Sequence, residues 1–410
     1  MKRSTERILT THVGSLARPD ALVPLLRAKD RGQPYDRESY AKLVREAVSD
    51  VARRQVEAGV DIVTDGEQGK ASFFGYVVER FTGFERKPAP SGQEGNPRGM
   101  SRDYRDFPDY YAWSERIAEW AGGRGGDRRH GVDVCTGKVS YKGHAIVQAD
   151  IDNLKSAIEG LRGGLGGHVG ALPTPEDVFM PAIAPSYISA TLANEFYRTE
   201  EEYEQALADA LREEYRAIVD AGFVLQVDDP RLVTYYMMNP NVGVEDCRRW
   251  AAKRVEVINY ALRGIPRERV RFHTCYSIDV GPRVHDMELK DIVDVLLKVE
   301  AGAFSFEAAN PRHEHEYHVF EQVRPPDGMI LIPGVISHTT NLVEHPELIA
   351  ERIVRFAKIV GREQVIAGAD CGFAASGIRF NDVHASVPWL KFAAMAEGAR
   401  LATKQLWGRA

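Results

Sequence analysis

The sequence predicts a (β/α)₈ barrel, an α/β fold in which eight parallel strands alternate with helices. Two observations support this prediction. A unit of helix, glycine and short apolar run recurs along the chain, and residues with charged or metal-binding side chains stand at the ends of the apolar runs. The chain has 410 residues, 44% of them hydrophobic, which is enough for one large core. We therefore expect a single barrel domain over residues 1–410.

The recurring unit occurs three times. The copies start at Val56, Val219 and Val299, and each reads Val, an acidic residue, Ala and Gly before an apolar run. A glycine just past the end of a helix supplies a left-handed cap, so each copy indicates a helix, a turn and a buried strand. Upstream of the second copy, residues 199–221 place apolar side chains at helical spacing.

Nine apolar runs are candidate strands, one more than the barrel needs. Continuous apolar runs, rather than alternating ones, are typical of parallel strands that are covered on both faces. The weakest run is 132–140, which we expect to be a hairpin or an outer strand. The nine runs are 7–15, 60–66, 132–140, 177–184, 223–228, 269–275, 303–307, 328–336 and 364–370.

Residues 85–130 interrupt the repeat after the second strand. This stretch is rich in Pro, Gly, Arg and Asp, and it carries several aromatic residues between Tyr104 and Trp113. We expect an insertion whose aromatic side chains either cover a site as a lid or pack the insertion onto the barrel. The glycines of 162–170 do not have the spacing of a dinucleotide-binding fingerprint after a strand, which excludes a Rossmann fold.

Composition excludes several classes of function. The net charge is −6, from 53 basic and 59 acidic residues, and this argues against nucleic acid as a partner. We find no run of 18 apolar residues and no apolar signal segment, so we predict no contact with a membrane. Four cysteines without close pairing favour a reducing, cytoplasmic compartment. The expected partners are small molecules, and the sequence carries no signal for the oligomeric state.

Residues whose side chains can bind a metal or act in catalysis follow six of the apolar runs. The active sites of barrel enzymes are built at the carboxyl ends of the strands. We therefore expect these residues to share one rim and to form an active site. In chain order they are Asp65 and Glu67, Asp228 and Asp229, His273 and Cys275, Glu307, His338, and Asp370 and Cys371.

Four of these residues suit a zinc ion. His273 and Cys275 are two positions apart at a strand end, so their side chains point to the same side. Cys371 and Glu307 follow other strands of the same barrel, and imidazole, thiolates and carboxylate are zinc ligands by type. Zinc with two thiolates favours the deprotonated, nucleophilic form of a bound thiol. The alternative is that the histidine and cysteines are buried core residues.

Together these residues resemble the catalytic C-terminal barrel of the cobalamin-independent methionine synthase family. The resemblance rests on TTHVGSLARP (10–19), DGE (65–67) and VDDP (227–230), followed by HTC, FE, SH and DCG in the family's order. It implies zinc-dependent transfer of a methyl or other alkyl group to a substrate thiol, homocysteine in the family. The implied zinc ligands are His273, Cys275, Glu307 and Cys371.

The resemblance also implies roles for five other residues. Glu67 and Asp228 would bind the amino group of the thiol substrate, and Gly14 and Ser15 would bind its carboxylate through the backbone. His338 would be the acid that assists the leaving group or polarises the donor. Two carboxylates suit an ammonium group, and backbone amides suit a carboxylate.

The donor is left open. Tyr187 is the rough counterpart of the aromatic residue that stacks on the pterin donor in the family, which places it in the substrate site. The resemblance extends to uroporphyrinogen decarboxylase in the same superfamily, but a decarboxylase of that type needs no zinc and would leave the His-x-Cys pair unexplained. A non-catalytic, zinc-stabilised binding barrel would not need acidic residues on the other strands.

A second resemblance is to the epoxyalkane:coenzyme M transferases, zinc barrels that open an epoxide with a thiol. It implies a cationic site for the sulfonate of coenzyme M, for which Arg18, Lys70 and Arg312 are available. The residues that carry it are EAANPRHEHE (307–316), PGVISHTTNLVEHPEL (333–348) and VIAGADCGF (365–373).

Two other groups of residues have alternative interpretations. The dense cluster His313–His318 is either a second metal site or the loop and helix start that follow the Glu307 strand. Cys135 and Cys247 have no partner in the pattern and are expected to be buried and inert.

Overall fold

The computed structural model describes residues 1–88, 101–120, 131–163, 172–276, 281–374 and 383–408. The predicted (β/α)₈ barrel is confirmed. Eight parallel strands follow the order β1-β10-β9-β8-β7-β6-β5-β2, and a parallel bridge from Thr11 to Ile62 brings the two ends of this sheet together. The barrel strands are β1 (Leu9–Thr10), β2 (Ile62–Val63), β5 (Asp177–Ile183), β6 (Val224–Asp228), β7 (Val270–His273), β8 (Ala303–Phe306), β9 (Ile330–Ile336) and β10 (Ile366–Ala369).

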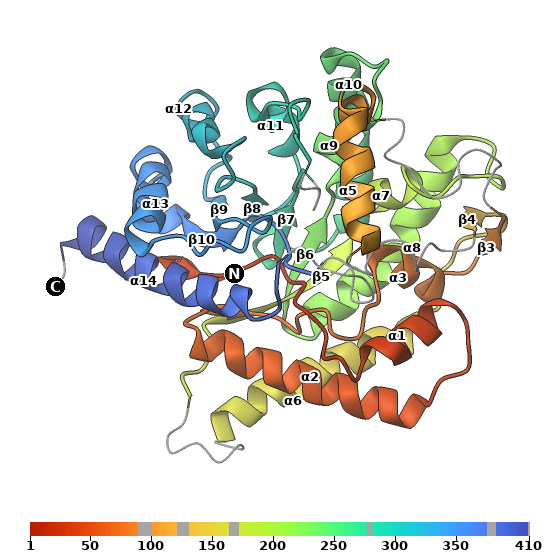
Figure 1. The fold of residues 1–410 in the computed structure, drawn as a ribbon, viewed down its shortest axis with the longest axis horizontal. Helices are drawn as coiled ribbons and strands as arrows, with labels where there is room; N and C mark the ends of the chain where they lie inside the picture. Colours follow the sequence, from red (N-terminus) through yellow and green to blue (C-terminus); the bar gives the residue numbers. More distant parts are fainter. Residues whose placement is uncertain (89–100, 121–130, 164–171, 277–280, 375–382, 409–410) are drawn as a thin grey trace.

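Helices surround the barrel (Figure 1). The long ones are α2 (Arg37–Glu57), α6 (His144–Gly163), α8 (Glu200–Asp220), α10 (Val244–Leu262), α13 (Pro346–Val360) and α14 (Val387–Trp407). The shorter ones are α1 (Val23–Asp30), α3 (Phe73–Arg80), α4 (Arg102–Asp106), α5 (Pro108–Trp120), α7 (Pro185–Ser189), α9 (Arg231–Met238), α11 (Val293–Leu296) and α12 (Val319–Gln322). In the described part of the chain, no helix is both long enough and apolar enough to cross a membrane.

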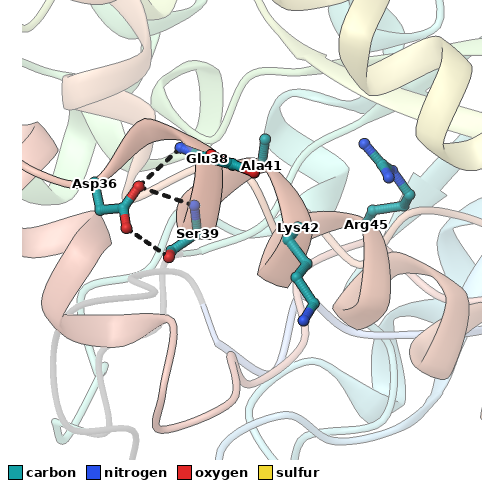
Figure 2. Close-up of a pocket in the computed structure, with 6 residues that line it drawn as sticks. All are labelled: Asp36, Glu38, Ser39, Ala41, Lys42 and Arg45. Carbon is teal, nitrogen blue, oxygen red and sulfur yellow. Dashed lines mark hydrogen bonds between the residues drawn. The ribbon is translucent and has the colours of Figure 1, made fainter.

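The start of α2 shows how local sequence sets a helix boundary. The Asp36 carboxylate accepts hydrogen bonds from the backbone N–H groups of Glu38 and Ser39, at 3.0 and 3.1 Å, and from the Ser39 hydroxyl (Figure 2). This satisfies donors that the first turn of a helix leaves free. Lys42 and Arg45 line the same surface hollow from the next turns of α2. The hollow is a helix-capping feature, and the strand-end residues take no part in it.

The weak strand candidate 132–140 is an outer strand, as one of the two interpretations predicted. β4 (Val132–Cys135) pairs antiparallel with β3 (Phe84–Lys87) in a separate two-stranded ribbon, from which the insertion leaves and to which it returns. The insertion follows β2, as predicted. Its segments 89–100 and 121–130 lie outside the described residues.

The described part of the insertion consists of α4 and α5. Their aromatic residues contact one another, with ring centroids 5.1 Å apart for Tyr104 and Tyr111 and 5.9 Å apart for Tyr110 and Trp113. Arg102 fixes α4 to the barrel, because its guanidinium donates to three backbone carbonyl groups at and after the end of α9. These ring contacts lie within the insertion, so both interpretations of its aromatic residues stay predictions.

The barrel interior is filled in layers. Residues two apart on a strand share a face, and the pairing of β6 with β7 sets Gln226 beside Arg271 and Asp228 beside His273. Arg271 is fully buried, donates to the Thr11 hydroxyl at 3.0 Å and lies over the Phe179 ring. An apolar layer lies below it, made of Leu9, Ile62, Phe179, Val224, Ala303, Ile330, Ile332 and Ile366. The polar strand-end residues therefore form the top layer.

Candidate active site

The strand-end residues gather at one rim, as predicted from their positions after the apolar runs. Because all eight strands are parallel, their carboxyl ends point the same way. All of these side chains are buried, although most are ionisable. Buried ionisable groups need partners or a ligand, so this rim is the natural place for a functional site. The residues are Glu67, Asp228, His273, Cys275, Glu307, His338, Asp370 and Cys371.

Three of the predicted metal ligands lie together. One ligand atom each of His273, Cys275 and Cys371 is within 4.8 Å of the other two, and we name this group the metal triad. The sulfur atoms of Cys275 and Cys371 are 3.0 Å apart. His273 and Cys275 come from the end of β7, and Cys371 follows β10.

The chemistry of the metal triad fits zinc. The Nδ1 atom of His273 is 3.1 Å from the Ser305 hydroxyl, whereas its Nε2 is buried without a hydrogen-bond partner in the described structure. Burial and the charge of Arg271 lower the pKa of His273 to about 3, so the imidazole is neutral and able to act as a ligand. The contact with Cys275 and burial raise the pKa of Cys371, so a cation is needed to hold the two thiols as thiolates.

Glu307, the fourth predicted ligand, lies beside the metal triad but belongs to a neighbouring group. One of its carboxylate oxygens accepts the Tyr276 N–H at 2.6 Å, and the other accepts from Asn310 Nδ2 at 2.5 Å and Arg283 Nη2 at 3.1 Å. Burial raises the pKa of Glu307, and the charge of Arg283 opposes this shift. Glu307 groups with His338 and Asp370, whose ligand atoms lie within 4.8 Å of its own.

Asp370 ties the ends of three strands together. Its Oδ1 accepts the N–H groups of Ala308 and Ala309, both at 2.8 Å, and so fixes the segment that follows Glu307. Burial raises the pKa of Asp370 to about 6. A side chain at Gly334 on β9 would collide with it, since a Cβ there would lie 2.0 Å from Asp370 Oδ1. Asp370 therefore caps backbone groups and stands beside His338.

Two buried acids of the rim influence each other electrostatically. We name Glu67 and Asp228 the acidic pair. Burial raises the pKa of both, and for Asp228 the charge of Glu67 adds to the shift, which carries it well above its ordinary value. The Glu67 carboxylate lies 3.9 Å from Arg18 Nη2, and Asp228 accepts from Gln226 Nε2 at 2.8 Å. The acidic pair is therefore suited to bind a cation.

The backbone supports this arrangement at both acids. Glu67 has a φ of 56°, and its N–H donates to Asp65 Oδ1 at 2.9 Å. Asp229 holds the start of α9, because its Oδ1 accepts the Arg231 N–H at 2.8 Å. Asp65 and Asp229 are the other acidic residues at these two strand ends. They thus shape the turns that present Glu67 and Asp228.

Gly14 and Ser15 lie next to the acidic pair and to the metal triad. A Cβ at Gly14 would be 3.1 Å from Glu67 Oε1, and Gly14 has a φ of 139°. The Ser15 carbonyl accepts the Phe373 N–H at 2.9 Å, two residues past Cys371. The Gly14 N–H points to His12 Nδ1 at 3.3 Å, so this backbone group already has a partner, and the carboxylate contact of Gly14 and Ser15 stays a prediction.

Tyr187 stands on α7, directly after β5. Burial raises its pKa, and the charges of Arg231, Asp229, Cys275 and Cys371 all reach it. Arg231 lies 5.8 Å from the centre of its ring. The ring therefore belongs to the rim, within electrostatic reach of the metal triad.

The cations proposed for a sulfonate are engaged elsewhere. Arg18 donates to the carbonyl groups of Leu16 and Ala374 at 2.8 and 3.0 Å. Lys70 Nζ donates to the Pro181 carbonyl at 2.7 Å, and the exposed Arg312 donates to the Val284 carbonyl, also at 2.7 Å. Each of these cations therefore already has a backbone acceptor within hydrogen-bond distance.

The cluster His313–His318 separates into ion pairs. His313 is buried between Glu316 Oε2 at 2.7 Å and Asp286 Oδ2 at 3.1 Å, and these contacts outweigh burial and raise its pKa to about 9. Glu314 pairs with Arg352. The loop interpretation is therefore the better one. Cys135 and Cys247 are buried, and burial raises the pKa of both thiols.

Two residues that matter for the rim were not predicted from the sequence. Arg271 lies in the middle of an apolar run and points into the barrel, where its charge lowers the pKa of His273. Arg283 follows β7 by ten residues and reaches back to Glu307. The alternation of side chains along β7 would have placed Arg271 on the same face as His273, but nothing in the sequence signals the contact of Arg283.

The fold and the rim define a (β/α)₈-barrel enzyme with candidate metal ligands at the carboxyl ends of its strands. Residues 185–390, half of the chain, match the family described as the catalytic domain of cobalamin-independent synthases. The chain belongs to this family, as the first resemblance predicted.

Relatives and solved structures agree with this assignment. The methionine synthase of Sulfolobus acidocaldarius is 24% identical over 88% of this chain and 85% of its own length. That of Thermococcus kodakarensis is 22% identical over 97% and 94%. A B12-independent methionine synthase from Shewanella sp. W3-18-1, in complex with selenomethionine, has the same fold with a TM-score of 0.69, at 20% identity over 98% of this chain and 100% of that one.

Proposed function

We propose that this protein is a zinc-dependent methyltransferase that alkylates the thiol of an amino acid, with homocysteine as the acceptor. The related proteins of similar extent are methionine synthases. The single observation that carries the proposal is the acidic pair, Glu67 and Asp228, at the same rim as the metal triad. A thiol at the triad and an ammonium group at the acidic pair belong together in one small molecule.

The acidic pair would bind the amino group of the acceptor. Burial raises the pKa of both carboxyl groups, so a positive charge bound beside them would favour their ionised forms. An ammonium group would add positive charge and hydrogen-bond donors at the pair, and hydrogen bonds to a charged group stabilise by about 1.5–3 kcal/mol each. Ser15, next to Gly14, would offer its backbone to the acceptor carboxylate.

The metal triad would hold zinc, and Glu307, the fourth predicted ligand, would stand next to it as an exchangeable carboxylate. Bound zinc would lower the pKa of the acceptor thiol and so favour its nucleophilic thiolate at neutral pH. The role of the protein is to keep His273 neutral through burial and to orient its ring through Ser305.

His338 would complete the reaction from the donor side. The thiolate sulfur forms a bond to the methyl carbon, the bond from that carbon to the donor breaks, and His338 supplies the proton that the departing donor atom takes up. Asp370 stands within reach of His338 and fixes the strand ends around it. Tyr187, across the rim, offers an aromatic face to the donor.

Thiol addition to an epoxide is less well supported, although it would use the same triad. That reaction with coenzyme M requires a cationic site for the sulfonate, and Arg18, Lys70 and Arg312 all donate to backbone carbonyl groups instead. The acidic pair would repel a sulfonate. An amino-acid thiol matches the charges of the rim better.

Calorimetric binding of two thiols tests the proposal. Homocysteine carries the amino group, whereas 4-mercaptobutyrate has the same thiol and carboxylate without it. In Glu67→Gln, we expect the Kd of homocysteine to rise about 10- to 100-fold, which corresponds to the loss of one hydrogen bond to a charged group. The Kd of 4-mercaptobutyrate should stay unchanged. Glu195→Gln, at an exposed surface pair with Lys87, is the matched control. An equal loss for both thiols, or none for either, would refute the assignment.

A further inference from the structure

The segment after β7 contains a residue in an unusual conformation. Arg283 has a φ of 55°, in the left-handed region that residues with a side chain rarely adopt. Such a conformation persists only where its surroundings hold it, and it is common at functional sites. Arg283 is also buried, with a relative exposure of 8%. A buried arginine on strained backbone indicates that the position of this guanidinium matters.

The Arg283 side chain reaches the carboxylate beside the metal triad. Its Nη2 donates to Glu307 Oε2 at 3.1 Å, and its Nε donates to Asp286 Oδ2 at 2.7 Å. The guanidinium also lies 5.6 Å from the centre of the Tyr276 ring, and the Tyr276 N–H holds the other oxygen of Glu307. Glu307 is thus held from both sides, in a position outside the metal triad.

Asp286 is itself fixed on its far side. His313 Nε2 lies 3.1 Å from the Asp286 oxygen that also accepts from Arg283, and the His313 ring stacks on Tyr276 with centroids 3.9 Å apart. Arg283 therefore has two acceptors whose positions do not depend on it.

The insertion holds the backbone of the same segment. Asp103, on α4, is buried, and its carboxylate accepts a hydrogen bond from the His285 N–H at 3.3 Å and interacts electrostatically with the backbone of Arg283. Asp106, at the end of α4, contacts His285 Nε2 at 2.7 Å. Because Arg102 anchors α4 to the end of α9, the contacts run without a break from the barrel wall through α4 to Glu307.

We propose that Arg283 is a positioning residue that holds Glu307 away from the metal triad, and that the insertion sets Arg283 in place through Asp103. This inference rests on the proposed function. Arg283 makes the carboxylate of Glu307 exchangeable. When the acceptor thiol binds at the triad, the carboxylate keeps Arg283 as its charged partner. The insertion then contributes to thiol binding without touching the thiol.

A double-mutant cycle tests the role of Arg283. In Arg283→Gln, Glu307 loses its cationic partner and competes with the thiol, so we expect the Kd of homocysteine to rise about tenfold while zinc content stays at that of the wild type. In the double variant Arg283→Gln/Glu307→Gln, the competing carboxylate is gone, and the Kd should return to within about twofold of the Glu307→Gln value. Asp103→Asn should raise the Kd two- to fourfold.

Arg312→Gln is the matched control, since Arg312 donates to the Val284 carbonyl in the same segment and its contacts do not include Glu307. It should bind homocysteine as the wild type does. Zinc X-ray absorption is a second readout, in which Arg283→Gln should gain oxygen ligation in the absence of thiol. The inference is overturned if Arg283→Gln binds homocysteine like the wild type, or if the double variant shows no rescue. Absence of zinc or of homocysteine binding in the wild type would overturn the proposed function instead.

Discussion

Gly334→Ala should damage the point where β9 and β10 meet. A Cβ at this position would lie 2.0 Å from Asp370 Oδ1 and 2.7 Å from the Asp370 Cα and N. The clash includes backbone atoms of the next strand, so no side-chain rotation relieves it. Overpacking of this kind costs about 1–3 kcal/mol. The two hydrogen bonds from Ala308 and Ala309 to Asp370 would weaken as well, at about 1 kcal/mol each.

The free energy of unfolding should therefore fall by about 2–5 kcal/mol, measured by urea denaturation with unchanged slope. Asp370 precedes Cys371, so zinc content should fall too. Gly160→Ala is the control, because nothing lies within 4 Å of its Cβ and it sits inside α6. That change should stabilise the helix by about 0.5–1 kcal/mol. If Gly334→Ala unfolded at the same urea concentration as the wild type and kept its metal, the close approach of β9 and β10 would be wrong.

Two further predictions follow from the cysteines and from His313. Removal of metal with a chelator, followed by mild oxidation, should form a disulfide between Cys275 and Cys371, whose sulfur atoms are 3.0 Å apart. The number of titratable thiols should then fall from four to two. Four remaining thiols would contradict the geometry of the triad. The pKa of His313 is raised to about 9, so its charged form contributes stability that is fully present below about pH 6.5 and is lost as pH rises through 9. The free energy of unfolding should fall between pH 6 and pH 10, and this fall should be larger in the wild type than in His313→Gln by on the order of 3 kcal/mol. An equal fall in both proteins would refute the ion pairs around His313.

The positions of residues along strands could be predicted from the sequence, whereas contacts between loops could not. His273 and Cys275 are two residues apart on one strand, and parallel strands bring Cys371 to the same rim, so the metal triad follows from periodicity and topology. The acidic pair follows from the same rule. Glu307 was expected as a fourth member, but its place depends on Arg283, which reaches it through an irregular segment with a positive φ.

The hydrogen-bond partners of side chains near the rim could not be predicted from the sequence either. Arg18 and Lys70 are cations near the rim, yet each meets a backbone carbonyl that the sequence does not mark. Periodicity gives the face of a strand on which a residue lies, and it does not tell which polar groups of other segments meet that face. That the chain forms one domain, and that the insertion acts as a lid, stay predictions.

The central claim is that the metal triad holds zinc and receives the acceptor thiol. Metal analysis and zinc X-ray absorption of the wild type and Cys371→Ser, with and without homocysteine, test it most directly. We predict one equivalent of zinc in the wild type, its loss in Cys371→Ser, and one additional sulfur ligand when homocysteine is added. A wild-type protein that holds no zinc after purification with zinc present, or that gains no sulfur ligand from homocysteine, would contradict the account.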